Sequence, residues 1–352
     1  MSEQNQTEKA LVCVRSITYN QAPYIEDTMN GFCMQETDFP FVCTIIDDAS
    51  TDGEQDVIRR YLRDHFDMED QDVVRNEETD DYILTYARHK ENQNCFFAVL
   101  YLKYNHYSIG KGSQKNGYIK EWLDGAKYVA LCEGDDYWID PNKLQKQVNY
   151  LESHPECGMV YTQVSQLIQD SGRFIKGWAA QTDFDDLLLN ANKIITLATV
   201  IRADLYNQFS KAIGYNHKWL MGDFPLWLFI SHQSDIKYID DTTGVYRILS
   251  TSASHNTDIK VMRKFLVSTY DVRCHFAKKY GRESVLNLLA QKEVDNLLRL
   301  SVQKNSNISL YIYQFAKEHK VLSIKILLKC LLYSNKIGRK LHKKRNPSNA
   351  NM

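Results

Sequence analysis

The chain has 352 residues, of which 43 are lysine or arginine and 44 are aspartate or glutamate, so its formal net charge at pH 7 is −1. This balance excludes the global basic field of many nucleic-acid-binding proteins, and no nucleic acid partner is expected. The chain starts without the apolar core of a signal peptide, and no apolar run is long enough to span a bilayer. The eight cysteines form no Cys-x-x-Cys pair, which favours reduced thiols in a cytoplasmic protein over a zinc site.

The first half of the chain alternates predicted strands and helices. Strands are expected at 11–18, 41–46, 73–74 and 128–132, and helices at 24–34, 54–66, 92–107 and 143–153. This order predicts an α/β unit with a parallel sheet. The run 41–46 is almost wholly apolar, which suits a strand covered on both faces.

After residue 153 the pattern changes to short strands. A hairpin is expected at 158–168 with 174–175, strands at 194–201, 236–239 and 245–248, and a helix at 224–231. From about residue 257 onward the chain reads as helix. We therefore expect a disordered or extended N-terminus at 1–10, an α/β domain at 11–255, a helical region at 256–345 and a disordered tail at 346–352.

The most informative motif follows the predicted strand 128–132, where Glu133, Asp135 and Asp136 stand in a glycine-containing turn. Carboxylates at the carboxyl end of a strand lie where open α/β sheets bind ligands. Mg²⁺ and Mn²⁺ take oxygen ligands and often bridge to a substrate phosphate. The alternative is an acidic loop that caps the next helix, and Asp140 before Pro141 accounts for such a cap. That alternative leaves the other three acids unexplained.

A second acidic turn, residues 47–53, follows the strand 41–46. It is similar to a calcium-binding loop of the EF-hand type, but no glutamate stands in register, so that interpretation is rejected. A cap for the helix at Glu54 accounts for Ser50 or Asp52. Asp48 is left as the predicted substrate contact.

Three segments, 18–20, 46–53 and 133–138, resemble in order and spacing the motifs of the family 2 glycosyltransferases of the GT-A fold. The resemblance covers roughly residues 11–250. It implies an α/β fold of the GT-A nucleotide-diphospho-sugar transferase type, with a mixed, mostly parallel sheet, helices on both faces and a helical C-terminal segment. It also implies a metal-dependent inverting glycosyltransferase of hexosyltransferase type. Such an enzyme moves a sugar from a nucleoside-diphosphate sugar, UDP-linked by default, to a glycan or lipid-linked acceptor in bacterial cell-surface polysaccharide biosynthesis.

The resemblance implies roles for four residues in donor binding. Tyr19 stacks near the nucleotide base, and Asp48 accepts a hydrogen bond from that base. Asp135 holds the ribose or the donor sugar, and Asp136 coordinates Mg²⁺ or Mn²⁺. A bound cation would stabilise the charge that develops on the departing nucleoside diphosphate.

The sequence departs from the family pattern at three places. Ile17 stands where a proline is common, and Glu133 stands where an aspartate is usual, so Glu133 is retained only as a possible ligand. Many relatives have an arginine in the loop before the metal-binding strand. Here Lys111 and Lys115 lie in a longer loop, and they are predicted to serve the diphosphate.

Two later residues complete the predicted site. By resemblance, Asp223 is the general base that deprotonates the acceptor hydroxyl, although Asp before Phe224-Pro225 is also a good helix N-cap. Both roles are compatible. Arg247 is placed near the diphosphate, because an arginine fork suits phosphate, or else in a surface ion pair.

Three further side chains are possible ligand contacts, and each also has an explanation that needs no ligand. His255 is a possible metal ligand or a solvated loop residue. Trp138 and Trp227 are possible stacking partners for a sugar, although aromatic residues are more often part of the core.

The C-terminal region carries apolar residues at helical spacing and many cations. Such a basic amphipathic segment either packs its apolar stripe on the catalytic domain or lies on an anionic membrane surface. We favour packing for 324–332 and membrane contact for 336–345, and the second would make the protein peripheral on the inner face of the membrane.

Two other functions remain open. One is a non-catalytic scaffold of the same fold that binds a sugar nucleotide or a glycan. The other, ranked low, is a nucleotidyltransferase, which would normally have a glycine-rich phosphate loop where this chain has residues 19–23.

Overall fold

The computed structural model describes residues 9–214, 216, 218–249 and 258–345. These form two compact units. The described residues within 9–187, 191–216 and 229–249 make up the first, and those within 188–190, 218–228 and 258–345 make up the second. His255 and most of the tails predicted at 1–10 and 346–352 lie outside the described residues. The predicted boundary at 255 also falls outside them, so that division stays a prediction.

The first unit is built on one sheet with the strand order β3-β5-β6-β2-β1-β7-β11-β9-β12-β8. Its centre is parallel, because β1 (Val12–Thr18) lies between β2 (Phe41–Asp47) and β7 (Tyr128–Leu131), and β2 pairs with β6 (Cys95–Leu102). The other strands are β3 (Phe66–Asp67), β4 (Arg75–Glu78), β5 (Tyr82–His89), β8 (Tyr137–Trp138), β9 (Cys157–Ile168), β10 (Arg173–Lys176), β11 (Thr199–Arg202) and β12 (Asp235–Ile248).

The sheet is mixed, as predicted, and its parallel run does not continue through the outer strands. Outside the centre, only β9 and β12 pair in parallel among the described strands, and β5, β8, β10 and β11 pair antiparallel with their neighbours. The reason is that β11 enters antiparallel between β7 and β9 and so ends the parallel run.

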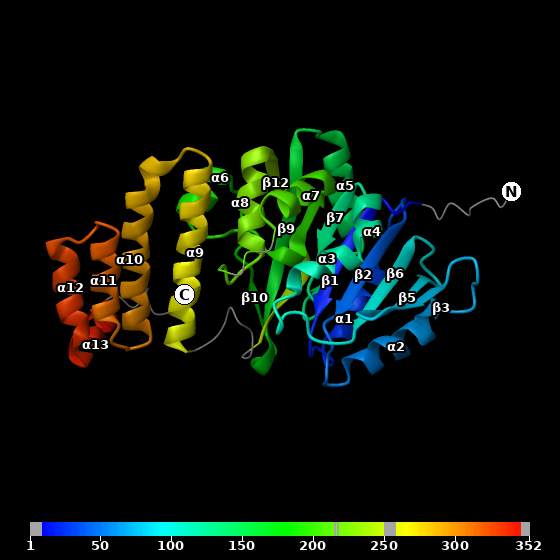
Figure 1. The fold of residues 1–352 in the computed structure, drawn as a ribbon, viewed down its shortest axis with the longest axis horizontal. Helices are drawn as coiled ribbons and strands as arrows, with labels where there is room; N and C mark the ends of the chain where they lie inside the picture. Colours follow the sequence, from blue (N-terminus) through cyan, green and yellow to red (C-terminus); the bar gives the residue numbers. More distant parts are fainter. Residues whose placement is uncertain (1–8, 215, 217, 250–257, 346–352) are drawn as a thin grey trace. The chain divides into compact units, whose positions relative to one another are not determined.

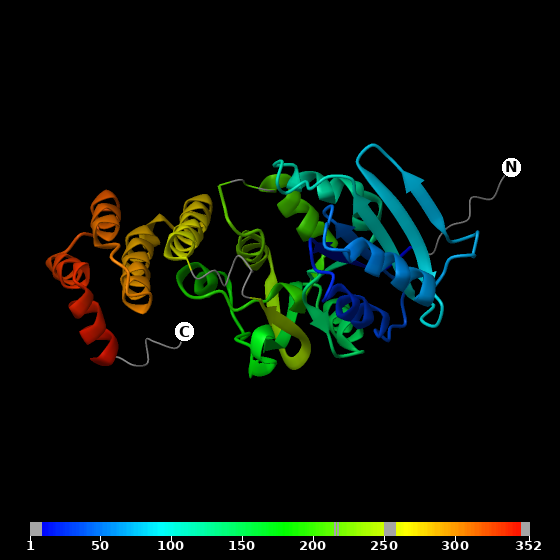
Figure 2. The ribbon, with the colours of Figure 1, turned by 90° about the horizontal axis from the view of Figure 1, so that it is seen from below.

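Helices cover both faces of the sheet (Figure 2). The chain moves from β1 through α1 (Ile25–Cys33) to β2 and through α2 (Glu54–His65) toward β6, and then returns through α3 (Lys115–Tyr118) and α4 (Lys120–Gly125) to β7. Right-handed crossovers in opposite directions place the two helix pairs on opposite faces. The remaining helices before residue 250 are α5 (Lys143–Ser153), α6 (Phe184–Leu189), α7 (Ala203–Ala212) and α8 (Asp223–Gln233).

The predicted helix at 92–107 is wrong, because this segment contains β6. The strand Cys95–Leu102 is almost wholly buried and pairs with both β2 and β5. An unbroken apolar run has no periodicity that separates a buried strand from a buried helix. Three smaller expectations also change. No strand forms at 73–74, and β4 begins just after it at Arg75. A short 3-10 helix, Thr196–Ala198, stands within the strand expected at 194–201 and precedes β11, and the two strands expected after 235 are one strand, β12.

The second unit is helical from residue 258 to 345, as predicted (Figure 1). Its helices are α9 (Ile259–Lys279), α10 (Leu286–Gln303), α11 (Ser309–Glu318), α12 (Ile324–Ser334) and α13 (Lys336–Arg345). Fully buried apolar side chains from three of them, among them Phe276, Leu297 and Ile312, form its core. Among the described residues, no helix has the length and apolar character needed to cross a bilayer.

Candidate active site

Three motifs that are far apart in the sequence meet at one edge of the sheet. The main-chain N–H of Asp48 donates to Thr18 O at 2.9 Å, and the N–H of Gly134 donates to Ile17 O at 3.1 Å. The turns after β2 and β7 therefore flank the carboxyl end of β1, which is the central strand of the parallel run. This is the edge at which open α/β sheets bind ligands.

Asp48 is buried and holds the loop that follows β6. Its carboxylate accepts hydrogen bonds from the main-chain N–H groups of His106 at 2.8 Å and Tyr107 at 3.2 Å. It also pairs with Lys115, whose Nζ lies 2.6 Å from Oδ2. Burial lowers the pKa of Lys115, and the charge of Asp48 partly offsets this effect. The predicted contact with a nucleotide base stays a prediction, and it would have to use a lone pair that these three donors leave free.

Glu54 joins the first two motifs, and sequence reasoning missed this role. Its buried carboxylate accepts hydrogen bonds from Thr18 Oγ1, from the N–H of Gln21 at 2.8 Å and from Ser50 Oγ at 2.8 Å. Burial raises the pKa of Glu54, while these donors oppose the shift. The expected cap is confirmed for Asp52, whose Oδ1 accepts the N–H of Glu54 at 3.1 Å. The one available signal was that Glu54 opens a helix directly after an acidic turn.

Asp135 and Asp136 lie in the turn after β7. Asp136 is buried, and its Oδ1 accepts the main-chain N–H of Arg247 at 2.8 Å. Burial raises the pKa of Asp136 well above its usual value, and the neighbouring charge of Asp135 adds to the shift. Burial also raises the pKa of Asp135, which the charge of Arg247 opposes. Two acids are thus held close together at a place where a positive ligand would stabilise both.

Arg247 reaches this turn from β12, and its guanidinium is 4.9 Å from the ring centre of Tyr24 and 4.7 Å from that of Tyr137. It pairs with Asp27 and donates to Gln169 Oε1 at 2.9 Å. Its Nε is buried and has no hydrogen-bond partner among the residues that the structure describes. The alternative of a surface ion pair describes only one contact of Arg247, because this residue is 5% exposed and lies beside the acidic turn.

Gly134 allows the acidic turn to approach β1. A Cβ atom at this position would lie 2.1 Å from Thr18 Oγ1 and 2.4 Å from Thr18 Cβ. No side chain can be accommodated at that distance without movement of the turn. The close approach is also supported by Thr28, whose hydroxyl donates to Gly134 O and Asp136 O.

Three other predicted residues lie in the first unit near these turns along the chain. Tyr19 is 44% exposed, so its ring is available for stacking. Lys111 is exposed and places its ammonium 5.3 Å from the ring centre of Tyr104. Glu133 is half-buried. Their roles in donor binding stay predictions.

The suggested stacking of the two tryptophans on a sugar is wrong, because both indoles are buried. Trp138 donates from Nε1 to Leu197 O at 2.8 Å and packs edge-on against Phe32. The buried ammonium of Lys143 lies 4.2 Å from its ring centre. Trp138 therefore packs in the core directly after the acidic turn, and Trp227 also belongs to the core.

Asp223 begins α8 and belongs to the second unit. Burial raises its pKa, and hydrogen bonds from its own main-chain N–H and that of Phe224 oppose the shift. This confirms its position at a helix start. Its role as a base stays a prediction.

The described residues contain no group of three or more His, Cys, Asp or Glu side chains that could hold a metal ion. A magnesium or manganese ion does not need such a group when one or two carboxylates and substrate phosphates complete its coordination. The pair Asp135 and Asp136 fits that smaller donor set.

Comparison with known proteins identifies similar sequences. Residues 13–176 match the model of the family described as glycosyl transferase family 2. The uncharacterized protein Rv1520 of Mycobacterium tuberculosis is 33% identical over 193 residues, which are 53% of this chain and 45% of that protein. The chain thus spans about half the length of the first curated relatives it matches. TuaG of Bacillus subtilis, whose name assigns it provisionally to teichuronic acid biosynthesis as a glycosyltransferase, is 26% identical over 77% of this chain and 92% of its own.

A solved structure shares the fold. The crystal structure of S. aureus TarS 1–349 in complex with UDP-GlcNAc superposes with a TM-score of 0.51 and covers 95% of this chain and 91% of that one. The sequence identity is 14%, so this likeness concerns the fold alone.

Proposed function

We propose that the chain, which has the GT-A fold and whose residues 13–176 match the model of glycosyl transferase family 2, is a member of that family. We further propose that it transfers a sugar from a nucleoside-diphosphate sugar to a glycan or lipid-linked acceptor. UDP is the proposed carrier, and a cell-surface polysaccharide is the proposed product. The name of TuaG, which refers to teichuronic acid, and the UDP-GlcNAc in the TarS crystals support these choices.

One observation carries the proposal: the turns that hold Asp48 and Asp136 are both hydrogen-bonded to the last residues of β1. A nucleotide bound across the end of β1 would meet the exposed ring of Tyr19 and the loop anchored by Asp48 on one side. On the other side it would meet the acidic turn and Arg247. This arrangement suits a ligand with a base at one end and a diphosphate at the other.

We assign Asp135 and Asp136 to a Mg²⁺ or Mn²⁺ ion that the donor shares. Asp136 is buried and Asp135 is half-buried, and burial raises the pKa of both, so a divalent cation would favour their charged forms. When bound, such an ion supplies charge stabilisation to the departing diphosphate. Arg247 adds a fixed positive charge, and its unpartnered Nε is an available donor for a phosphate oxygen.

Asp223 is the proposed general base of an inverting transfer. A carboxylate whose pKa is raised by burial is a better proton acceptor than an exposed one. It would take the proton of the acceptor hydroxyl while the hydroxyl oxygen bonds to the anomeric carbon and the nucleoside diphosphate leaves from the opposite face. We assign the catalytic domain to residues 11–255 and the helical region to 256–345.

A thermal-shift screen of nucleoside diphosphates, with and without Mn²⁺, tests the donor site. We expect UDP to raise the unfolding temperature only with the metal, and Asp136→Asn to lose that response. Asp140→Asn is the matched control, since Asp140 lies just beyond the turn and pairs with Lys146. A full response in Asp136→Asn, or no response of the wild type to any nucleoside diphosphate, would contradict the proposal.

A further inference from the structure

The last two helices of the second unit, α12 and α13, expose several large apolar side chains. Ile324 is 78% exposed and Leu331 is 70% exposed. We call this set the C-terminal ridge; its members are Ile324, Leu328, Leu331 and Leu332 of α12 and Ile337 and Leu341 of α13. Exposed apolar side chains that are grouped in this way mark interaction surfaces.

The ridge is not the side through which α12 packs. Cys330 and Tyr333 are the buried side chains of this helix, and they lie on the side away from Leu328 and Leu331 at helical spacing. The stripe within 324–332 is therefore exposed in its own unit. Its expected packing on the catalytic domain stays a prediction.

Two residues hold α13 against the end of α12. A Cβ atom at Gly338 would lie 2.1 Å from Leu332 O, so the two helices approach each other closely there. The buried guanidinium of Arg339 donates to Tyr333 O and, at 3.3 Å, to Asn305 Oδ1. The first of these hydrogen bonds satisfies the carbonyl group of Tyr333 near the end of α12, and both restrain the direction of α13.

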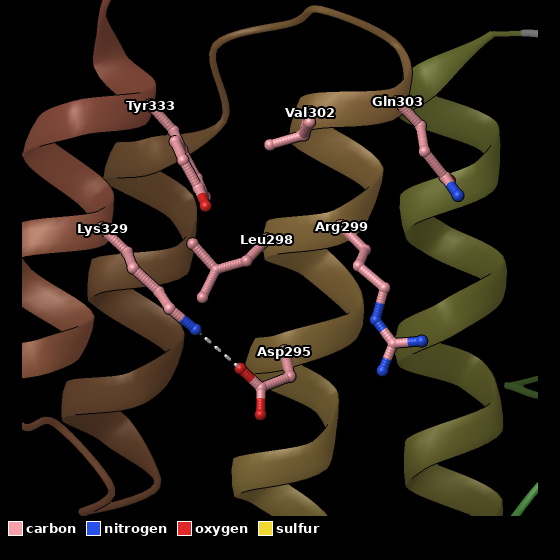
Figure 3. A pocket seen from close by; sticks show the side chains of 7 residues that line it. All are labelled: Asp295, Leu298, Arg299, Val302, Gln303, Lys329 and Tyr333. Atoms are coloured by element: carbon pink, nitrogen blue, oxygen red, sulfur yellow. Dashed lines mark hydrogen bonds and ion pairs between the residues drawn. The ribbon is translucent and has the colours of Figure 1, made fainter. Parts of the chain in front are cut away.

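The charge around the ridge is positive. The sequence contains no aspartate or glutamate after Glu318. Among the side chains that the structure describes on α12 and α13, Lys325, Lys336, Lys340 and Lys343 are exposed. Lys329 contributes less to this positive charge, because its Nζ lies 3.3 Å from Oδ1 of Asp295 on α10. The pair lies at a pocket of about 350 Å³ between α10 and α12 (Figure 3).

These features together specify the partner. A second copy of the same surface would bring lysines against lysines, which disfavours a symmetric dimer through the ridge. A bilayer that contains anionic lipids offers both an apolar interior for the leucines and phosphates for the lysines. We propose that α12 and α13 bind the surface of an anionic lipid bilayer through the C-terminal ridge and the four lysines beside it.

Sedimentation with lipid vesicles tests this proposal on the full chain. We expect binding to vesicles of equal parts phosphatidylglycerol and phosphatidylcholine, and much weaker binding to phosphatidylcholine alone. The double variant Leu328→Ser/Leu331→Ser should bind at least about tenfold more weakly, because each buried leucine contributes apolar area. The matched control is Phe174→Ser, which removes a 56% exposed aromatic side chain from β10 in the other unit and should bind as the wild type does.

The lysines give a second, independent measurement. Each lysine near an anionic surface contributes about fivefold in affinity, so Lys336→Gln/Lys340→Gln should weaken binding roughly 25-fold, and added salt should weaken the wild type. Circular dichroism verifies folding, which these exposed substitutions should not disturb. Equal binding of the wild type to both vesicle types, or unchanged binding of the leucine variant, would overturn the proposal. No sugar donor is present in the assay, so its outcome does not depend on the proposed transfer activity.

Discussion

Lys115 Nζ lies 2.6 Å from Asp48 Oδ2, and the two side chains are 5% and 2% exposed. This buried ion pair joins the turn after β2 to the loop and short helix that precede β7. It indicates that Asp48 organises the edge of the site through the loop after β6, besides any contact with a nucleotide.

Removal of one partner of this pair should destabilise the protein. Lys115→Met leaves the carboxylate of Asp48 buried without its cation, and we expect a loss of about 3–5 kcal/mol in the free energy of unfolding. The double variant Asp48→Asn/Lys115→Met should recover part of that loss, because no unpaired charge remains. Urea unfolding measures both. The control Lys111→Met removes an exposed lysine of the same loop and should cost less than about 1 kcal/mol; an equal cost for both single variants would contradict the prediction.

Gly134→Ala should disturb the meeting of the motifs. The new methyl group would lie 2.1 Å from Thr18 Oγ1, and we expect a destabilisation of about 1–3 kcal/mol together with weaker nucleotide binding. Gly117→Ala is the matched control, because nothing lies within 4 Å of the position that its methyl group would take. Thermal unfolding and UDP titration are the measurements. Wild-type values for Gly134→Ala would show that the turn does not depend on this close approach.

Arg247→Lys should weaken donor binding while the protein remains folded. Lysine keeps the positive charge but loses the planar group between Tyr24 and Tyr137 and the free Nε donor. We expect the dissociation constant for UDP with Mn²⁺ to rise roughly tenfold or more. Isothermal titration calorimetry measures it, and the exposed Arg173→Lys on β10 serves as control. Unchanged affinity would place Arg247 outside the donor site.

Asp223→Asn should separate catalysis from donor binding. Asparagine is also a good residue at a helix start, so α8 should be preserved. We expect the transfer rate to fall roughly 10²–10⁴-fold while UDP affinity stays within about twofold. The rate of the wild type should rise with pH through the raised pKa of Asp223, since only the ionised carboxylate accepts a proton. Asp204→Asn, at the start of α7, is the control. Full transfer activity of Asp223→Asn would exclude Asp223 as the base.

Glu293 should make the second unit less stable as pH rises. Burial raises its pKa from 4.5 to about 7, so the folded state binds more protons than the unfolded state between these values. Below pH 4.5 Glu293 is protonated in both states and does not lower the free energy of unfolding. As the pH rises through 7, this free energy falls by up to roughly 3 kcal/mol.

Glu293→Gln removes this dependence. We expect it to raise the unfolding temperature at about pH 8 and to change little near pH 4.5, where the wild-type side chain is already protonated. The exposed Glu318→Gln should follow the wild type at both values. Parallel stability curves for Glu293→Gln and the wild type would contradict the shifted pKa.

Local patterns in the sequence were enough to predict the strands β1, β2 and β7 and the polar turns after them. These strands are short apolar runs bounded by glycine and acids, which is a strong signal. Because the carboxyl ends of parallel strands share an edge, the meeting of Asp48 and Asp136 at one edge followed as well. The same approach failed at β6, where an apolar run without periodicity was assigned to a helix.

The partners of the site residues depend on folding, because they are far away in the sequence. Asp48 and Lys115 are 67 positions apart, and the N–H of Arg247 reaches Asp136 across 111 positions. No local pattern identifies such pairs. The same is true of burial, which makes Trp138 a core residue and leaves the leucines of α12 exposed.

By itself, the sequence determined the resemblance to family 2 glycosyltransferases, the order of the central strands along the chain and the acidic turns, since each depends on neighbouring residues. Only the tertiary structure decided which donors occupy Asp48, which rings enclose Arg247 and which side of α12 is available to a partner. The physical reason is that strand pairing and helix packing bring distant segments together, and the exposure and charge environment of a side chain depend on those segments.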